Sequence, residues 1–267
     1  MTAAAFGRRR SIARRDSLIR LSLRAAVLIV ILAAWQAAGD DANRLTLPTF
    51  TGTMRAFGEM TLDGSLPVAM FNTTQALVGG FTLALAIGIP LGIGMGNWPA
   101  IGRVGWPYLL ALLAVPMIAI SPIIQIVFGL TLVARIVIVF VFAFIYITVN
   151  TMVGVRSVEP SLREMGASFC ASEGQMLRHI IFPAATPAIM AGVRLGLGRA
   201  LIGMVVAELT LVGGGIGSLI QDYRALFQPS YVFALIVAIL LQGVLLMAIA
   251  RRVEGRLSRW EGSGAIE

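Results

Sequence analysis

The feature that most constrains this fold is a series of apolar segments, each about long enough to cross a membrane. Six of them alternate with polar stretches along the chain, at 18–38, 72–96, 104–120, 132–153, 187–211 and 231–250. A helix needs about 20 mainly apolar residues to cross the hydrocarbon core of a bilayer. Lipid offers no hydrogen-bond partners, so a spanning segment must satisfy its own backbone groups, which a helix does. The pattern therefore predicts an all-α, polytopic membrane protein with about six transmembrane helices.

The composition excludes an ordinary soluble domain. Hydrophobic residues make up 58% of the 267 residues and charged residues 13%, and the mean hydropathy is +0.88. Soluble domains carry about 45–50% apolar and about 25% charged residues. We expect residues 1–17 to form a basic N-terminal segment and residues 18–267 to form one transmembrane domain. A cleaved signal peptide is the alternative for 18–38, but this run exceeds the 7–15 apolar residues typical of one.

The polar residue types exclude several chemistries. All 21 basic residues are arginine, so the chain lacks the lysine that a Walker A phosphate loop requires. The arginines cluster at the ends of the apolar segments, which argues against a nucleic-acid partner. The single cysteine (Cys170) and single histidine (His179) exclude an internal disulfide and do not suffice for a metal or catalytic cluster. We expect no catalytic residue, metal site or cofactor in this chain.

The distribution of arginine predicts the orientation of the spans. Cytoplasmic segments of membrane proteins carry an excess of Lys and Arg. With both termini inside, the external segments hold four arginines (Arg44, Arg55, Arg135 and Arg224). The internal segments hold fifteen, at positions 8, 9, 10, 14, 15, 20, 24, 103, 156, 163, 178, 251, 252, 256 and 259. The sequence thus predicts cytoplasmic termini, a cytoplasmic loop at about 156–185, and an external loop at 40–67 with room for one short helix.

The loop at 156–185 has a helical pattern of its own. Glu159-Pro160-Ser161 is typical of a helix start, because proline is tolerated in a first helical turn. Between Ser157 and Gln175 we expect two helices joined by a turn. Three apolar residues are spaced three and four apart and share one face: Leu162, Met165 and Phe169. Periodicity alone leaves two interpretations open, a docking surface for another protein or a face that packs back on the bundle.

The same loop carries a recognisable motif. Glu164-Met165-Gly166, then Cys170, then Ile180 to Pro183 resembles the EAA loop of the inner-membrane permease subunits of binding-protein-dependent ABC importers. Further similarity lies in 187–194, in Ala207-Glu208 and in 213–220. The chain is most similar to the subgroup that handles nitrate, sulfonates, taurine, bicarbonate and similar small solutes. Two positions depart from the family pattern: Met165 and Gly166 replace a pair of alanines, and Cys170 replaces a glycine whose freedom at positive φ a cysteine lacks.

The resemblance implies a function and a set of partners. Residues 18–267 would be the permease domain of a multi-pass protein of the bacterial inner membrane, and 156–185 its coupling loop. The partners would be two copies of a cytoplasmic ATP-binding subunit, a second permease copy, an external solute-binding protein and membrane lipid. A small anionic solute is expected; a neutral or cationic heterocycle, or a membrane-embedded enzyme, is the alternative. The residues implied in ATPase coupling are Leu162, Glu164, Met165, Gly166, Phe169, Cys170, Ile180 and Pro183.

Two charged residues inside the fifth apolar segment are candidates for the solute path or gate. Ionisable residues within a span usually face the bundle interior or a water-filled cavity. Arg199 lies near mid-membrane, where it either attracts an anionic solute or pairs with a neighbouring span. Glu208 lies near the outer end, where it either lines the path or caps the glycine-rich turn at 213–215.

Overall fold

The computed structural model describes residues 22–23, 25–40, 47–210 and 214–257, and no strand occurs among them. An apolar helix at Ala25–Ala38 comes first. The other elements, in chain order, are α2 (Phe50–Leu62), α3 (Ser65–Asn97), α4 (Pro99–Ala114), α5 (Met117–Phe128), α6 (Leu132–Arg156), α7 (Pro160–Ser168), α8 (Glu173–Met176), a π-helical turn (Leu177–Ile181), α9 (Phe182–Thr210), α10 (Ile216–Ala225) and α11 (Pro229–Leu257). The all-α prediction is confirmed.

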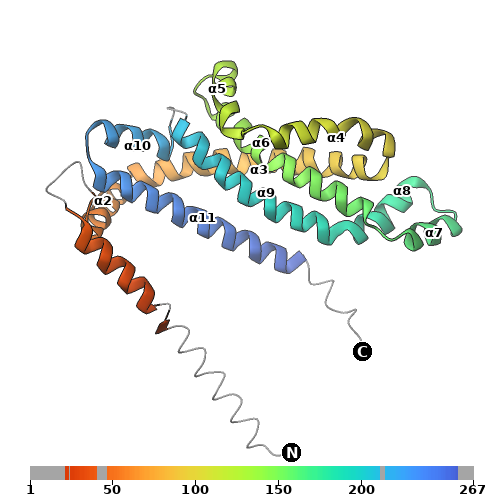
Figure 1. The fold of residues 1–267 in the computed structure, drawn as a ribbon, viewed down its shortest axis with the longest axis horizontal. Coiled ribbons are helices and arrows are strands. Elements are labelled where there is room, and N and C mark those ends of the chain that lie inside the picture. The colour runs from red at the N-terminus through yellow and green to blue at the C-terminus, as the bar shows by residue number, and fades with distance from the viewer. Residues whose placement is uncertain (1–21, 24, 41–46, 211–213, 258–267) are drawn as a thin grey trace, which may run out of the picture.

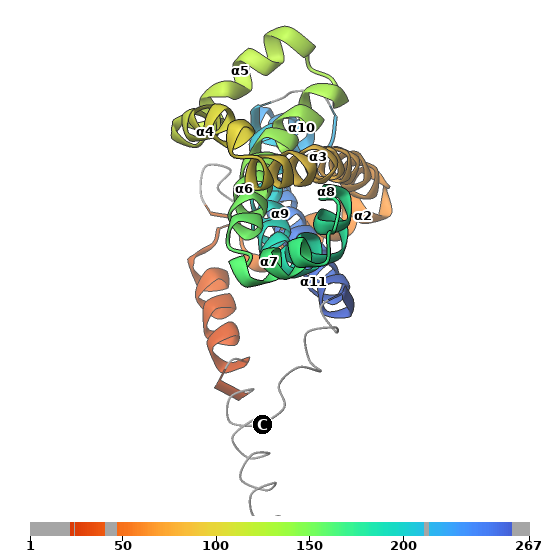
Figure 2. The same ribbon diagram turned by 90° about the vertical axis from the view of Figure 1, so that its right-hand side faces the viewer.

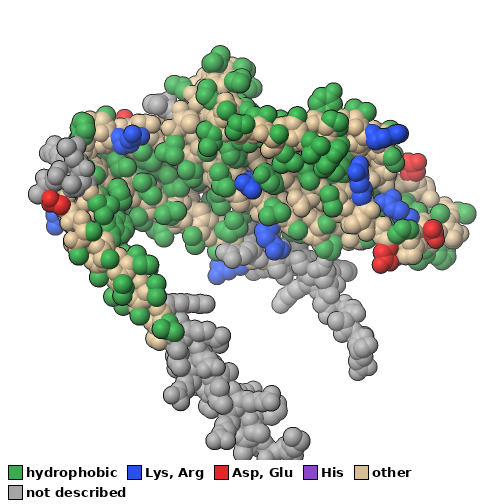
Figure 3. Space-filling model, in the orientation of Figure 1, with side chains coloured by type: hydrophobic (Ala, Val, Ile, Leu, Met, Phe, Trp, Pro, Cys, Tyr) green, Lys and Arg blue, Asp and Glu red, His purple; other side chains and the backbone are tan. Residues whose placement is uncertain are grey.

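The six predicted apolar segments are helical where they are described, except at Val115 and Pro116. Among the described residues, four helical stretches are long and apolar enough to cross a membrane: Ser65–Asn97, Leu132–Arg156, Glu173–Thr210 and Pro229–Ile249. The pair α4 and α5 qualifies as a fifth span if the two are taken together, although they are bent by 99°. On the face shown in Figure 3, apolar side chains cover most of the surface and acidic side chains lie at the two ends. The chain has the surface of a polytopic membrane protein.

Two predicted boundaries are wrong. The third span was expected to stop at Ser121-Pro122, but the helix breaks earlier, at Val115 and Pro116, where the backbone is extended. Pro122 instead lies inside α5. The second span was expected to begin at 72, but α3 begins at Ser65; the short helix allowed in the 40–67 segment is α2, with 13 residues. The two helices are separated by Gly64, whose φ of 82° a residue with a side chain rarely adopts.

The core of the bundle is built on α6, which packs against α3 on one side and α9 on the other. Gly88, Gly92 and Gly96 lie four residues apart on α3 and leave one helix face without side chains, which makes this approach possible. A Cβ at Gly92 would lie 2.6 Å from the Thr151 Cβ, and one at Gly96 would lie 2.6 Å from the Val155 Cβ. On the other side, a Cβ at Gly196 would lie 2.5 Å from the Ile147 Cγ1.

The elongated bundle has two distinct ends. α7 and α8 lie at one end, and α2 and α10 lie at the other, while α5 projects from the side (Figure 1). Figure 2 shows α5 standing away from the bundle, whereas α4 lies beside α3 and packs on it through Leu109 and Met95. The first helix meets the α2 end through Trp35, whose indole N–H donates to the Pro48 carbonyl at 2.9 Å. The predicted coupling loop and the predicted external segments therefore lie at opposite ends.

Candidate functional site

The loop between α6 and α9 has the helix–turn–helix form that the sequence predicts. α7 begins with Pro160 in its first turn after Glu159. α8 begins after Ser172, whose hydroxyl accepts from the Gln175 N–H while the Gln175 side chain accepts from the Ser172 N–H. This capping box satisfies two backbone donors that a helix start otherwise leaves unpaired. α8 then continues through the π-helical turn into α9, so the loop is joined directly to a membrane span.

Arginines fasten this loop to the ends of two spans. The guanidinium of Arg163 donates to the Val155 carbonyl at 2.8 Å and to the Asn97 side chain at 3.3 Å. Arg163 thereby holds α7 against the ends of α3 and α6. Arg156, the last residue of α6, donates to the Met95 carbonyl at 3.2 Å and so joins α6 to α3. In the sequence both arginines count only as positive charge, and no local pattern reveals these contacts.

The predicted apolar face of the loop is divided. Leu162 is half-buried and packs on the cluster that contains Val155 and Ile181. It therefore does not belong to an exposed face with Met165 and Phe169. Met165 and Phe169 are exposed, at 46% and 81%. The division arises because the bundle covers only one side of α7 and because Phe169 lies in the turn after the helix.

The remaining predicted coupling residues divide in the same way. Gly166 is buried, and a Cβ there would lie 2.6 Å from the side chains of Ile180 and Met176. Ile180 is half-buried, whereas Glu164, Cys170 and Pro183 are exposed. The structure therefore brings Leu162, Gly166 and Ile180 together on the inner side of the loop. The other five predicted residues face outward.

Cys170 adopts the left-handed backbone that its replacement of glycine put in doubt. Its φ is +52°. The Ala171 N–H donates to the Gly166 carbonyl at 3.0 Å, and the Cys170 N–H donates to the Ala167 carbonyl at 2.9 Å. These two bonds form a Schellman motif, the usual ending of a helix on a residue at positive φ. The turn is built as in a glycine-containing loop, with Cys170 as the turn residue.

Glu208 is enclosed in a network at the opposite end of the bundle. Its carboxylate lies 3.4 Å from the Arg135 guanidinium and accepts hydrogen bonds from the Thr73 hydroxyl at 3.0 Å and the Gly217 N–H at 2.8 Å. Arg135 also donates to the Gly214 carbonyl at 2.9 Å. Glu208 is 1% exposed in this chain, and its contacts match the alternative in which it caps the glycine-rich turn at 213–215. The sequence analysis missed Arg135 and Thr73; an arginine in the first turn of an apolar helix was the available signal.

Arg199 has a different environment. It is exposed on α9, and its guanidinium carbon lies 4.4 Å from the centre of the Tyr146 ring on α6. A guanidinium over an aromatic face is attracted by the ring quadrupole. The partner on a neighbouring span is therefore an aromatic ring rather than a carboxylate.

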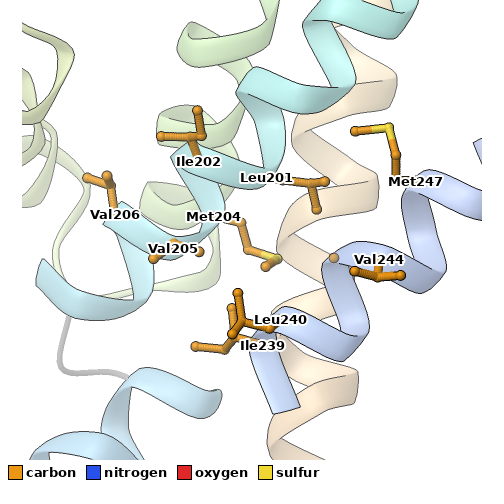
Figure 4. Close-up of a pocket in the computed structure, with 10 residues that line it drawn as sticks. Leu201, Ile202, Met204, Val205, Val206, Ile239, Leu240, Val244 and Met247 are labelled. Carbon is orange, nitrogen blue, oxygen red and sulfur yellow. The ribbon is translucent and has the colours of Figure 1, made fainter. Parts of the chain in front are cut away.

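An apolar hollow of about 500 Å³ lies between α9 and α11 (Figure 4). Its walls are aliphatic side chains such as Leu201, Met204 and Val244, together with Gly243. Without polar groups this hollow has no means of orienting a polar solute. Among the described residues, no group of three or more His, Cys, Asp or Glu side chains is placed to hold a metal ion.

Residues 88–259 match the protein family described as binding-protein-dependent transport system inner membrane component. The chain belongs to this family. The relatives agree with the assignment. The aliphatic sulfonates transport permease SsuC of Bacillus subtilis is 33% identical over 88% of this chain and 86% of its own length. The riboflavin transport permease RibX of Chloroflexus aurantiacus is 34% identical over 88% of this chain and 89% of its own.

A taurine transport permease, TauC of Escherichia coli, is 31% identical over 55% of this chain and 54% of its own length. Among solved structures, a chain of the MetNI methionine ABC transporter superposes with a TM-score of 0.58. That superposition covers 71% of this chain and 94% of the other at 18% identity, so it supports the fold.

The permease is therefore the membrane component of an ABC importer. Its family works with an ATP-binding subunit and a solute-binding protein. The family is one of transport components, and the fold is a multi-pass helical bundle in the membrane. The predicted importer function is confirmed at this level.

Proposed function

We propose that this permease carries a small anionic solute between two copies of itself, driven by two cytoplasmic ATP-binding subunits that dock on the α7–α8 loop. Hydrolysis occurs on those subunits, and this chain carries no cofactor or metal. An external binding protein delivers the solute to the end of the bundle that holds α2 and α10. A homodimer follows because one copy forms only one wall of a path, and closed two-fold symmetry is the commonest assembly of identical chains.

The observation that carries the coupling proposal is the exposed apolar tip of an anchored loop. Met165 and Phe169 point away from the bundle, while Arg163 and the buried Gly166 hold α7 in place. Exposed apolar side chains on a short helix are typical of a surface that enters a groove of a partner. Glu164, Cys170 and Pro183 are also exposed on the loop and the start of α9, while Leu162, Gly166 and Ile180 lie on the inner side.

Truncation of the tip tests the docking role. Burial of a phenylalanine contributes about 1.5–3 kcal/mol, so Phe169→Ala should weaken ATPase binding by roughly 10- to 100-fold. The measurement is co-purification and titration of the ATP-binding subunit in nanodiscs. Phe227→Ala is the matched control, since Phe227 is also exposed, at 60%, and follows a helix at the opposite end of the bundle. Normal ATPase affinity and normal uptake in Phe169→Ala would remove the tip from the docking surface.

The orientation of the permease is proposed from the arginine asymmetry, with both termini and the α7–α8 loop in the cytoplasm of a bacterial inner membrane. Cys170 is the only cysteine in the chain and is exposed at the loop. A membrane-impermeant maleimide should therefore label it in inverted vesicles and leave it unlabelled in intact spheroplasts. Labelling from the outside would reverse the topology.

The solute class is proposed from the relatives named for aliphatic sulfonates and taurine. Binding-protein-dependent uptake of ethanesulfonate, taurine and nitrate into proteoliposomes tests it. Riboflavin belongs in the same panel, because the riboflavin relative is equally similar. Uptake of riboflavin alone would overturn the anion assignment and leave the importer assignment in place.

A further inference from the structure

Arg199 is a charged side chain within a membrane span whose only partner, among the described residues, is an aromatic ring. Its guanidinium lies 4.4 Å from the centre of the Tyr146 ring, and no described residue accepts a hydrogen bond from it. In contrast, the buried Arg135 donates to Gly214 and pairs with Glu208. The N–H groups of Arg199 thus remain available to something outside this chain.

The depth of Arg199 in the membrane indicates what its N–H groups can contact. It lies 11 residues before Thr210, the end of α9, or about 17 Å at 1.5 Å per residue. This is close to half the thickness of a hydrocarbon core of about 30 Å. Charged residues at this depth face a polar partner or water. Exposure of Arg199 on the single chain therefore indicates a face that does not meet lipid.

Among the described residues, neither this chain nor an identical second copy supplies a carboxylate for Arg199. The described acidic residues lie in the loops and helices at the ends of the bundle, except for Glu208 on α9. Glu208 is enclosed and already paired with Arg135. A symmetry-related copy places the same residues at the same depth, so it presents another arginine and no acid. A positive site without a protein counter-ion calls for an anion from solution.

We propose that Arg199 lines the solute path and binds the oxyanion group of the solute, with the same arginine of the second copy completing the site. The inference rests on the proposed function and extends it to a named binding group. A guanidinium has five N–H donors and no acceptor, so it recognises sulfonate, carboxylate or nitrate oxygens through paired hydrogen bonds. The Tyr146 ring holds the guanidinium plane and leaves its edge for the anion.

The test measures the local potential beside Arg199 and needs no knowledge of the natural solute. Ile202 is 48% exposed and lies three residues after Arg199, on the same side of α9. The Ile202→Cys variant, in a Cys170→Ser background and bound to the ATPase in nanodiscs, is reacted with two thiosulfonate reagents during ATP turnover. One reagent carries a sulfonate and the other a trimethylammonium group. The ratio of their rates is compared with the ratio for 2-mercaptoethanol.

We expect the sulfonate reagent to be favoured by about tenfold or more, the effect of a unit charge several ångströms away at an effective dielectric constant of about 20. Arg199→Gln should abolish this preference, and Arg199→Lys should keep most of it. Arg194→Gln, which changes another exposed arginine eight residues from the reporter, should alter the ratio less than twofold because its charge is screened at that distance.

Three outcomes would overturn the inference: no reaction with either reagent, a ratio equal to that of the free thiol while Arg199 is present, or an equal loss in Arg194→Gln. The second outcome overturns the inference even if Arg199→Gln fails to fold, because it is measured with Arg199 present. ATPase co-purification from the same sample separates the two proposals. If the ATPase is bound and the preference is missing, only the anion site fails; if the ATPase does not bind the permease with the natural Cys170 either, the coupling proposal fails.

Discussion

The key residues of this permease fall into two groups: those that stabilise the bundle and those that we propose contact a partner or the solute. Arg135 and Glu208 are 5% and 1% exposed and are joined to Thr73 and to the start of α10, so this network connects α3, α6, α9 and α10 at one end of the bundle. At the other end of the bundle, Arg163 joins α7 to α3 and α6. Arg199, Met165 and Phe169 are exposed instead. Exposure, rather than residue type, distinguishes the proposed functional positions from the structural ones.

The buried network gives a prediction about stability. Removing one member of a buried ion pair leaves the other charge unpaired, at a cost of about 3–5 kcal/mol. Glu208→Ala should therefore lower the detergent melting temperature strongly. The double variant Arg135→Met, Glu208→Leu should recover much of this loss, because apolar replacement of a whole pair is often neutral. A double variant that is no more stable than Glu208→Ala would show that the pair is not the source of the loss.

The strained turn gives a second prediction. A left-handed backbone is unfavourable for a residue with a side chain by about 1–2 kcal/mol, and glycine avoids most of this strain. Cys170→Gly should therefore slow hydrogen exchange of the Cys170 and Ala171 amides, which close α7. Cys170→Ala, which removes the thiol but keeps the strain, is the control. Equal exchange in the two variants would mean that strain at this turn does not limit its stability.

At the scale of the helices, the sequence predicted which segments are helical more accurately than it predicted where each helix begins and ends. Apolar length identified the four long helices that can cross a membrane, and the proline at position 160 marked the start of α7. The break at Val115 and Pro116 and the early start of α3 at Ser65 were not predicted from any local pattern. The division of the Leu162, Met165 and Phe169 face was not predicted either, since the bundle decides which side of α7 is covered. Thr73 and Arg135 are distant from Glu208 in sequence, and only folding brings them together.

Close packing of α3 on α6 gives a third prediction. A Cβ at Gly92 would lie 2.6 Å from the Thr151 Cβ and 2.7 Å from the Thr148 carbonyl oxygen, whereas one at Gly94 would meet only the Trp98 ring at 3.8 Å. Gly92→Ala should destabilise the permease by about 1–3 kcal/mol through overpacking. Gly94→Ala should be neutral or stabilising, because alanine favours a helix by about 1 kcal/mol over glycine. Thermal unfolding of both variants in one detergent compares them; similar melting temperatures would contradict the close approach.

At the scale of the whole molecule, one helical stretch joins the two ends. Glu173–Thr210 is 38 residues long, or about 57 Å, and runs from the coupling loop to the level of Glu208. A displacement of the loop can therefore be transmitted to the opposite end along one continuous helical stretch, which contains the π-helical turn and Pro187. Transmission also requires α7 to move with the spans, and the Arg163 bonds to Val155 and Asn97 provide that attachment.

This arrangement predicts that Arg163→Ala separates ATP hydrolysis from transport. The apolar tip remains, so the ATPase should still bind and hydrolyse ATP, while a loop detached from α3 and α6 transmits less motion. We expect the number of solute molecules transported per ATP to fall several-fold in proteoliposomes, and the melting temperature to change by only a few degrees. Arg178→Ala is the control, because Arg178 is exposed at the start of the same long helical stretch. An unchanged ratio in Arg163→Ala would show that the loop does not need this anchor, and an equal fall in Arg178→Ala would trace the effect to lost charge rather than lost attachment.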